Sequence, residues 1–143
     1  MYKRAARVLF LEAGDGTRAR CAQALAPRGG GGWLMAATAT VDGGRPDTRL
    51  APLAARRGVG VDLRPCPLLC PERVSGCDLV VLLEREEGEV SRGEIQRPLK
   101  AWPLQGSAQP ATVADLERLA DHLEARLRGM AGGLRMLARA GGG

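Results

Sequence analysis

The residues that could do chemistry lie together near the start of the chain, where Glu12 and Arg18 flank a glycine-rich stretch. The apolar run from Arg7 to Leu11 precedes this stretch and predicts a strand buried on both faces. From about Thr17, small and apolar residues at helical spacing predict a helix. Backbone N–H groups of a glycine-rich loop, with the positive end of a helix behind them, can hold an anion. The predicted anion loop comprises Ala13, Gly14, Asp15, Gly16, Thr17 and Arg18.

A glycine-rich turn between a strand and a helix is also common wherever a parallel sheet is built, so the loop alone does not specify a function. Its sequence, however, resembles the phosphate-binding loop of the low-molecular-weight protein tyrosine phosphatase and arsenate reductase family. In that family an apolar strand is followed by C-x-G-N-x-C-R-S and a helix. Gly14 and Arg18 match this pattern, and Asp15 stands at the position of the Asn. Glu12 stands at the position of the nucleophilic Cys.

The resemblance continues beyond the loop and covers roughly residues 7–128. The G-V-D of residues 60–62 and the D-L-V-V of residues 78–81 are similar to two further family segments. In the family, a thiolate attacks the substrate, an Arg and backbone amides hold the oxyanion, and an Asp after the fourth strand protonates the leaving group. In this chain Gly106 stands at the position of that acid. The resemblance therefore implies a degenerate family member that lacks both the nucleophile and the acid.

Three functions remain open at this point. The first is a pseudo-phosphatase with a binding or regulatory role, in which Glu12 mimics the anion and pairs with Arg18, and whose partner is another protein. Such a loop would bind a phosphate-like anion weakly or not at all. The second is an enzyme of the same class with altered chemistry that uses Glu12 and Arg18. The third is a scaffold, or a binder of small molecules in the crevice at the strand ends.

The rest of the chain alternates between predicted strands and helices, which favours a parallel sheet covered on both faces. The resemblance adds a strand order of 2-1-3-4, so the expected fold is α/β, a three-layer α/β/α sandwich of the phosphotyrosine phosphatase I type. We expect one domain over residues 1–129 and a flexible glycine-rich tail over residues 130–143. The expected later strands are residues 33–41, 78–83 and 99–104. The first expected helix runs from Thr17 to a break at 27–32, and the second from Asp47 or Thr48 to about Arg57. The last expected helix runs from Pro110 to Gly129, with Thr112 as its N-cap.

Composition limits the class of partner. The formal net charge is +5 and aromatic residues make up only 3% of the chain. The arginines are scattered among acidic residues without interleaved aromatics, which argues against nucleic-acid binding. No apolar run is long enough to span a membrane, and the N-terminus lacks the core of a signal peptide. We therefore expect a cytoplasmic protein with reduced cysteines and no membrane contact.

No cofactor or metal site is predicted. Cys66, Cys70 and Cys77 do not have a zinc spacing, and the lone His122 lies on the last predicted helix. Buried thiols are the expectation, and a regulatory disulfide between Cys70 and Cys77 stays open. A cluster of acidic residues follows the third predicted strand, and we expect a solvated loop there. Its members are Glu84, Glu86, Glu87 and Glu89.

Overall fold

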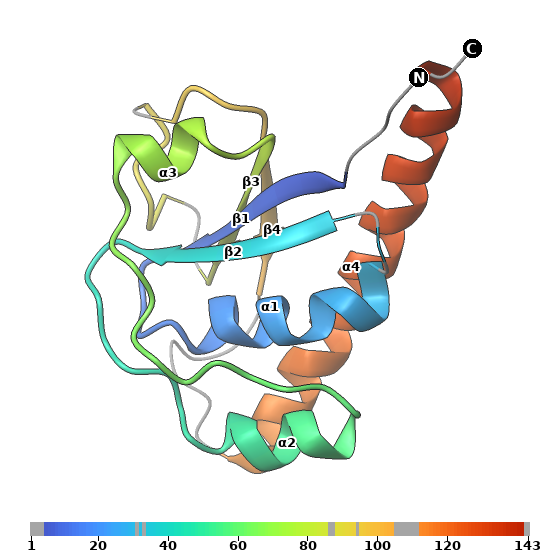
Figure 1. Ribbon diagram of the computed structural model, residues 1–143. Helices are drawn as coiled ribbons and strands as arrows, with labels where there is room; N and C mark the ends of the chain where they lie inside the picture. The colour runs from blue at the N-terminus through green and yellow to red at the C-terminus, as the bar shows by residue number, and fades with distance from the viewer. Residues whose placement is uncertain are drawn as a thin grey trace.

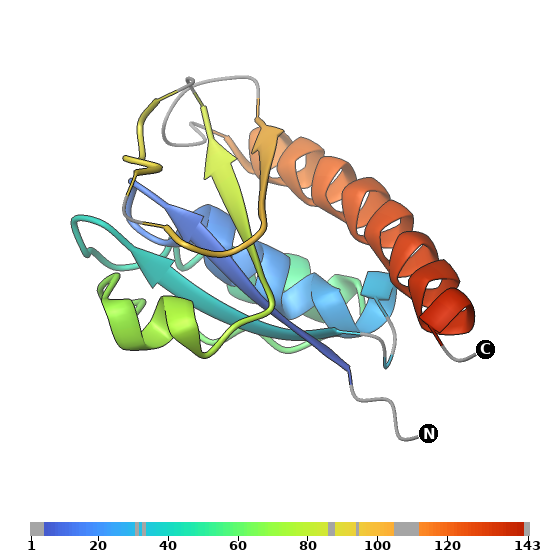
Figure 2. The ribbon, with the colours of Figure 1, turned by 90° about the horizontal axis from the view of Figure 1, so that it is seen from above.

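The computed structural model describes residues 5–30, 32, 34–85, 88–93, 95–104 and 112–141. Four parallel strands form one sheet in the order β2-β1-β3-β4, as predicted. Helices α1, α2 and α4 lie on one side of the sheet, and the short helix α3 lies on the other (Figure 1). Figure 2 shows the four strands side by side, with α3 near the β2 side of the sheet and α4 beyond β4. In chain order the elements are β1 (Ala6–Glu12), α1 (Thr17–Gly30), β2 (Leu34–Thr40), α2 (Leu50–Arg56), α3 (Pro71–Ser75), β3 (Leu79–Glu84), β4 (Leu99–Pro103) and α4 (Val113–Gly141).

Alternation along β1 explains the two cores. Val8 and Phe10 face α1 and α4, whereas Leu9 and Leu11 face α3, and all four are buried. The larger core, on the α1 side, includes the tilted pair of Phe10 and Trp102, whose ring centroids lie 5.8 Å apart. Strand β1 has a neighbouring strand on each side and helices on both faces, so its last residue, Glu12, lies in the interior of the protein.

Helix α4 begins as the sequence predicts. The Thr112 hydroxyl accepts the Asp115 N–H at 3.1 Å, and the Asp115 carboxylate accepts the Thr112 N–H at 3.1 Å. This is a reciprocal capping box. The end of the helix differs from the expected end at Gly129, because α4 continues to Gly141. Met130 and Ala131 are buried in the core, and this packing holds a further turn of helix that the glycines alone would weaken.

Two other helix ends also differ from prediction. The sequence predicts that α1 ends at Pro27, yet α1 continues to Gly30, because the turn before the proline buries Leu25 and Ala26 against the core. Arg49, rather than Asp47 or Thr48, occupies the N-cap of α2, and its side chain makes no capping hydrogen bond; Asp47 Oδ1 instead accepts the Arg49 N–H at 2.9 Å, directly before the helix.

Candidate anion loop

The Glu12 carboxylate lies inside the turn that it precedes. Its side chain is 1% exposed, and Oε1 accepts the backbone N–H of Ala19 at 3.0 Å. Ala19 is the third residue of α1, so the carboxylate occupies the positive end of that helix. A Cβ placed on Gly14 would lie 3.0 Å from Oε2, so a larger residue there would require the carboxylate to shift by a few tenths of an ångström.

Burial controls the protonation of this carboxylate. Removal from water raises the pKa of Glu12 from 4.5 to about 7, and the Asp15 carboxylate adds to this effect. The Ala19 amide and the charge of Arg18 lower the pKa, but by less. Burial of Glu12 therefore outweighs the charge of Arg18 in setting this pKa. Near pH 7 the group is divided between its charged and neutral forms.

Arg18 does not form the predicted direct ion pair with Glu12. The guanidinium is 4% exposed, and its NH1 donates to the Leu83 carbonyl at 3.2 Å. Among the ion pairs between described residues, none joins Glu12 and Arg18 within 4.0 Å. Arg18 acts on Glu12 through its charge, while its hydrogen bond to Leu83 ties the start of α1 to the end of β3.

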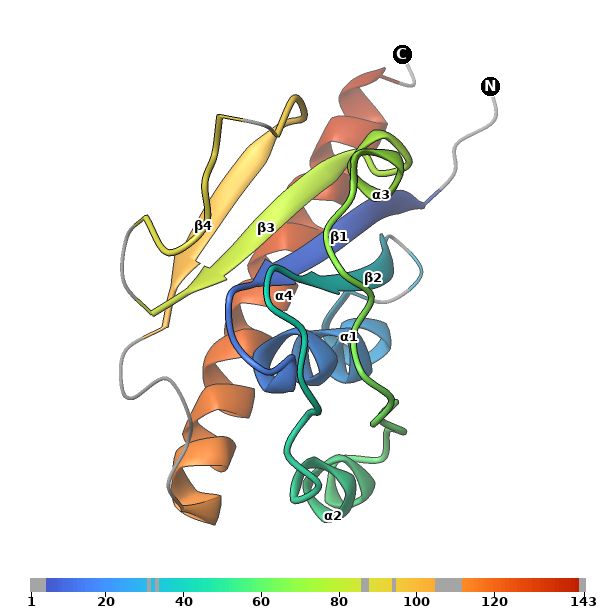
Figure 3. The same cartoon turned by 90° about the vertical axis from the view of Figure 1, so that its left-hand side faces the viewer.

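The remaining loop residues build the frame of the turn. Asp15 Oδ1 accepts the Thr17 N–H at 2.9 Å, and the Thr17 hydroxyl accepts the Asp47 N–H at 2.9 Å. Gly16 has a φ of +96°, which favours glycine, and its carbonyl accepts the first main-chain bond of α1 from Arg20 at 2.9 Å. Figure 3 shows the β1–α1 loop with the chain segments that follow β2 and α2 running beside it.

The sequence did not reveal the support behind the loop. Arg20 is 5% exposed; its Nε donates to the Arg64 carbonyl and its NH2 to the Pro65 carbonyl, both at 3.1 Å. These bonds hold the next residue, Cys66, against the loop, where its thiol lies 3.9 Å from the Gly16 carbonyl. The only signal in the sequence was the presence of Arg20 among the small residues of α1. Its carbonyl partners, Arg64 and Pro65, lie more than 40 residues away in the sequence.

The cysteines are mostly buried. All four are free, and burial raises the pKa of Cys21 to about 12 and also raises the pKa values of Cys66 and Cys77. The described residues contain no group of three or more His, Cys, Asp or Glu side chains that could hold a metal ion. His122 lies on α4, where burial lowers its pKa.

The acidic cluster after β3 is only partly a solvated loop. Glu84 is buried, and it accepts the Val90 N–H at 3.2 Å and pairs with Arg92, so it ties the following loop to the strand end. Glu89 pairs with Arg85 at 3.4 Å. Glu86, Glu87 and Gly106, the residue at the position of the family's acid, lie outside the described residues.

Comparison with solved structures identifies the fold. An arsenate reductase from Archaeoglobus fulgidus superposes with a TM-score of 0.72 at 23% identity, over 87% of this chain and 98% of the other. A second arsenate reductase, in its phosphate-binding state, gives 0.76 at 12% identity, over 90% and 98%. The YwlE arginine phosphatase from Geobacillus stearothermophilus gives 0.69 at 17%, over 92% and 94%.

The fold is that of the arsenate reductases and low-molecular-weight phosphatases. No protein-family model matches the chain, and a search of curated proteins found no match either. Within the part of the chain that the structure describes, no helix has both the length and the apolar character needed to cross a bilayer.

Proposed function

We propose that this protein is a non-catalytic relative of the low-molecular-weight phosphatases, with an anion loop occupied by its own Glu12, and that it acts by binding a partner protein. The observation that carries this proposal is the position of the Glu12 carboxylate. It lies at the end of β1, where the resembled family has its nucleophilic thiol, and it holds the Ala19 amide at 3.0 Å.

A bound oxyanion would have to displace this carboxylate. The amide of Ala19 at the start of α1 is already used by Oε1, and Gly14 lies against Oε2. In its ionised form the carboxylate would also repel an anion, at a cost of about 4 kcal/mol for like charges 4 Å apart. Protonation would remove the repulsion but leave the same atoms in the loop. Exclusion of phosphate and arsenate therefore has a steric part that does not depend on pH.

The second candidate function is catalysis by Glu12 itself, and one observation favours it. A carboxyl with a pKa of about 7 suits a general base near neutral pH. Two contacts oppose it: Glu12 is 1% exposed with Oε1 bonded to Ala19, and Arg18 donates to the Leu83 carbonyl. Neither group is presented to a substrate in this arrangement.

Activity assays separate the two functions. The wild-type protein is assayed for hydrolysis of p-nitrophenyl phosphate and for reduction of arsenate in the presence of thiol, next to Glu12→Gln, Glu12→Cys and the remote control Glu72→Gln. The proposal predicts no turnover above buffer for the wild type, Glu12→Gln and the control. It also predicts phosphate binding by Glu12→Cys, because the smaller side chain opens the loop. Wild-type turnover that Glu12→Gln abolishes and Glu72→Gln retains would establish catalysis by Glu12 instead.

A further inference from the structure

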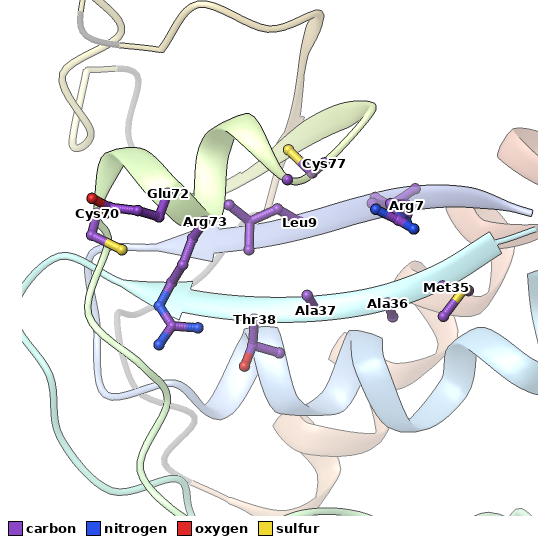
Figure 4. A pocket seen from close by; sticks show the side chains of 12 residues that line it. Arg7, Leu9, Met35, Ala36, Ala37, Thr38, Cys70, Glu72, Arg73 and Cys77 are labelled. Atoms are coloured by element: carbon purple, nitrogen blue, oxygen red, sulfur yellow. The ribbon is translucent and has the colours of Figure 1, made fainter.

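A groove lies on the α3 side of the sheet, away from the anion loop. Its volume is about 530 Å³, and its floor is formed by the first halves of β1 and β2 (Figure 4). Helix α3 forms one wall, and β2 is the edge strand of the sheet. This volume falls in the range of small-molecule sites.

The groove exists because α3 is short and the strand side chains beneath it are small. Leu9 and Ala37 face α3 from β1 and β2, and Ala37 rises only one carbon above the strand (Figure 4). Met35, on the same face of β2, is 61% exposed. A flexible thioether on a largely apolar floor adapts to apolar ligands of different shapes.

Two arginines provide the positive charge of this groove. Arg73 reaches from α3 across the groove toward β2, and Arg7 lies at the opposite end (Figure 4). Neither guanidinium forms an ion pair or hydrogen bond with another described residue. Glu72 also lines the groove, but among the described residues it forms no ion pair with Arg73 within 4.0 Å.

We propose that this groove binds an amphipathic carboxylate such as a medium-chain fatty acid. The carboxylate would meet the guanidinium of Arg73, which suits its two oxygens. The hydrocarbon chain would lie over Leu9, Met35 and Ala37, where it removes exposed apolar surface from water. Arg7 adds positive charge at the far end. The site does not include Glu12: the groove is lined by Arg7, Val8 and Leu9 of β1, whereas Glu12 lies at the carboxyl end of that strand, so the two proposals can fail independently.

Calorimetric titration with sodium decanoate below its micelle concentration tests this site. We expect saturable binding of one decanoate per chain. Arg73→Gln should weaken binding about tenfold, because it removes a charge-assisted pair. Ala37→Leu should weaken it further by filling the floor of the groove. The matched control is Arg128→Gln on α4, which makes the same charge change at an exposed position and should bind like the wild type.

The outcome that overturns the proposal is equally specific. Decanol in place of decanoate should bind much more weakly, since it has the chain without the charge. Equal binding of decanol, an unchanged affinity in Arg73→Gln, or no saturable binding of decanoate would refute the site as proposed. Binding of an acidic peptide but not of decanoate would instead identify the groove as a protein-docking surface. Circular dichroism of each variant confirms that the variants are folded.

Discussion

Replacing Glu12 with Gln should make the protein more stable at high pH and leave its stability little changed at low pH. Gln keeps a carbonyl oxygen that can accept the Ala19 N–H, but it cannot ionise. In the wild type, burial raises the pKa of Glu12 from 4.5 to about 7 in the folded state. The unfolded chain therefore releases this proton at lower pH than the folded chain, so the carboxyl makes folding less favourable as pH rises from 4.5 to 7.

The size of this effect follows from the two pKa values. A carboxyl with a pKa of about 7 when folded and 4.5 when unfolded weakens folding by about 3 kcal/mol once the pH is above both values. Urea unfolding of wild type and Glu12→Gln between about pH 5 and pH 8 measures it. The difference in unfolding free energy should be about 1 kcal/mol at pH 5 and should grow to about 3 kcal/mol in favour of Glu12→Gln at pH 8.

Taking the difference between the two proteins cancels the titration of His122 and the cysteines. Glu72→Gln is the control, because the pKa of Glu72 is lowered, mainly by its own backbone, and its difference should have the opposite sign. A Glu12→Gln protein that becomes less stable than wild type as pH rises would show that the loop stabilises an ionised carboxylate. That result would support an ion pair between Glu12 and Arg18. It would also refute the conclusion that burial has a larger effect than the charge of Arg18 on the pKa of Glu12.

Other substitutions test the frame around the loop. Gly16→Ala should lower the unfolding free energy by more than about 1 kcal/mol, because the residue has a φ of +96° and the added Cβ would lie 2.8 Å from the Cys66 sulfur. Urea unfolding measures this loss, and an unchanged unfolding midpoint would contradict the prediction. Arg57→Ala should cost about 2 kcal/mol, because it removes the bond at 2.9 Å to the buried Glu124, which keeps its pair with Arg28 at 3.3 Å. A smaller loss than for the exposed Arg56→Ala would contradict the network. Thr112→Ala should cost about 1 kcal/mol in the same assay by removing the cap of α4, and no loss would show that the cap is dispensable.

The fold could be predicted from the sequence because its signals are local or shared with a known family. The apolar runs of β1 and β3 and the stripe of α4 mark buried faces by their periodicity. The exact ends of helices could not be predicted, since they depend on tertiary packing. Burial of Met130 overrides the glycines that follow it, and burial of Leu25 and Ala26 carries α1 past Pro27.

The position of the Glu12 carboxylate in the turn could be predicted, but its electrostatics could not. The place of Glu12 after an apolar strand indicates a carboxylate at the loop, and the structure places it there. The sequence could not show that Arg18 turns to the Leu83 carbonyl, because that partner lies 65 residues away on another strand. The balance between burial and charge, which sets the pKa of Glu12, depends on that geometry.

Titration of the protein with inorganic phosphate, followed by calorimetry at about pH 8, tests most directly whether Glu12 fills the anion loop. The comparison is between wild type and Glu12→Ser, which empties the loop while leaving its backbone amides in place. The account predicts no saturable binding by the wild type and binding of one phosphate by Glu12→Ser. Equal phosphate binding by both proteins would show that the carboxylate does not occupy the loop in solution.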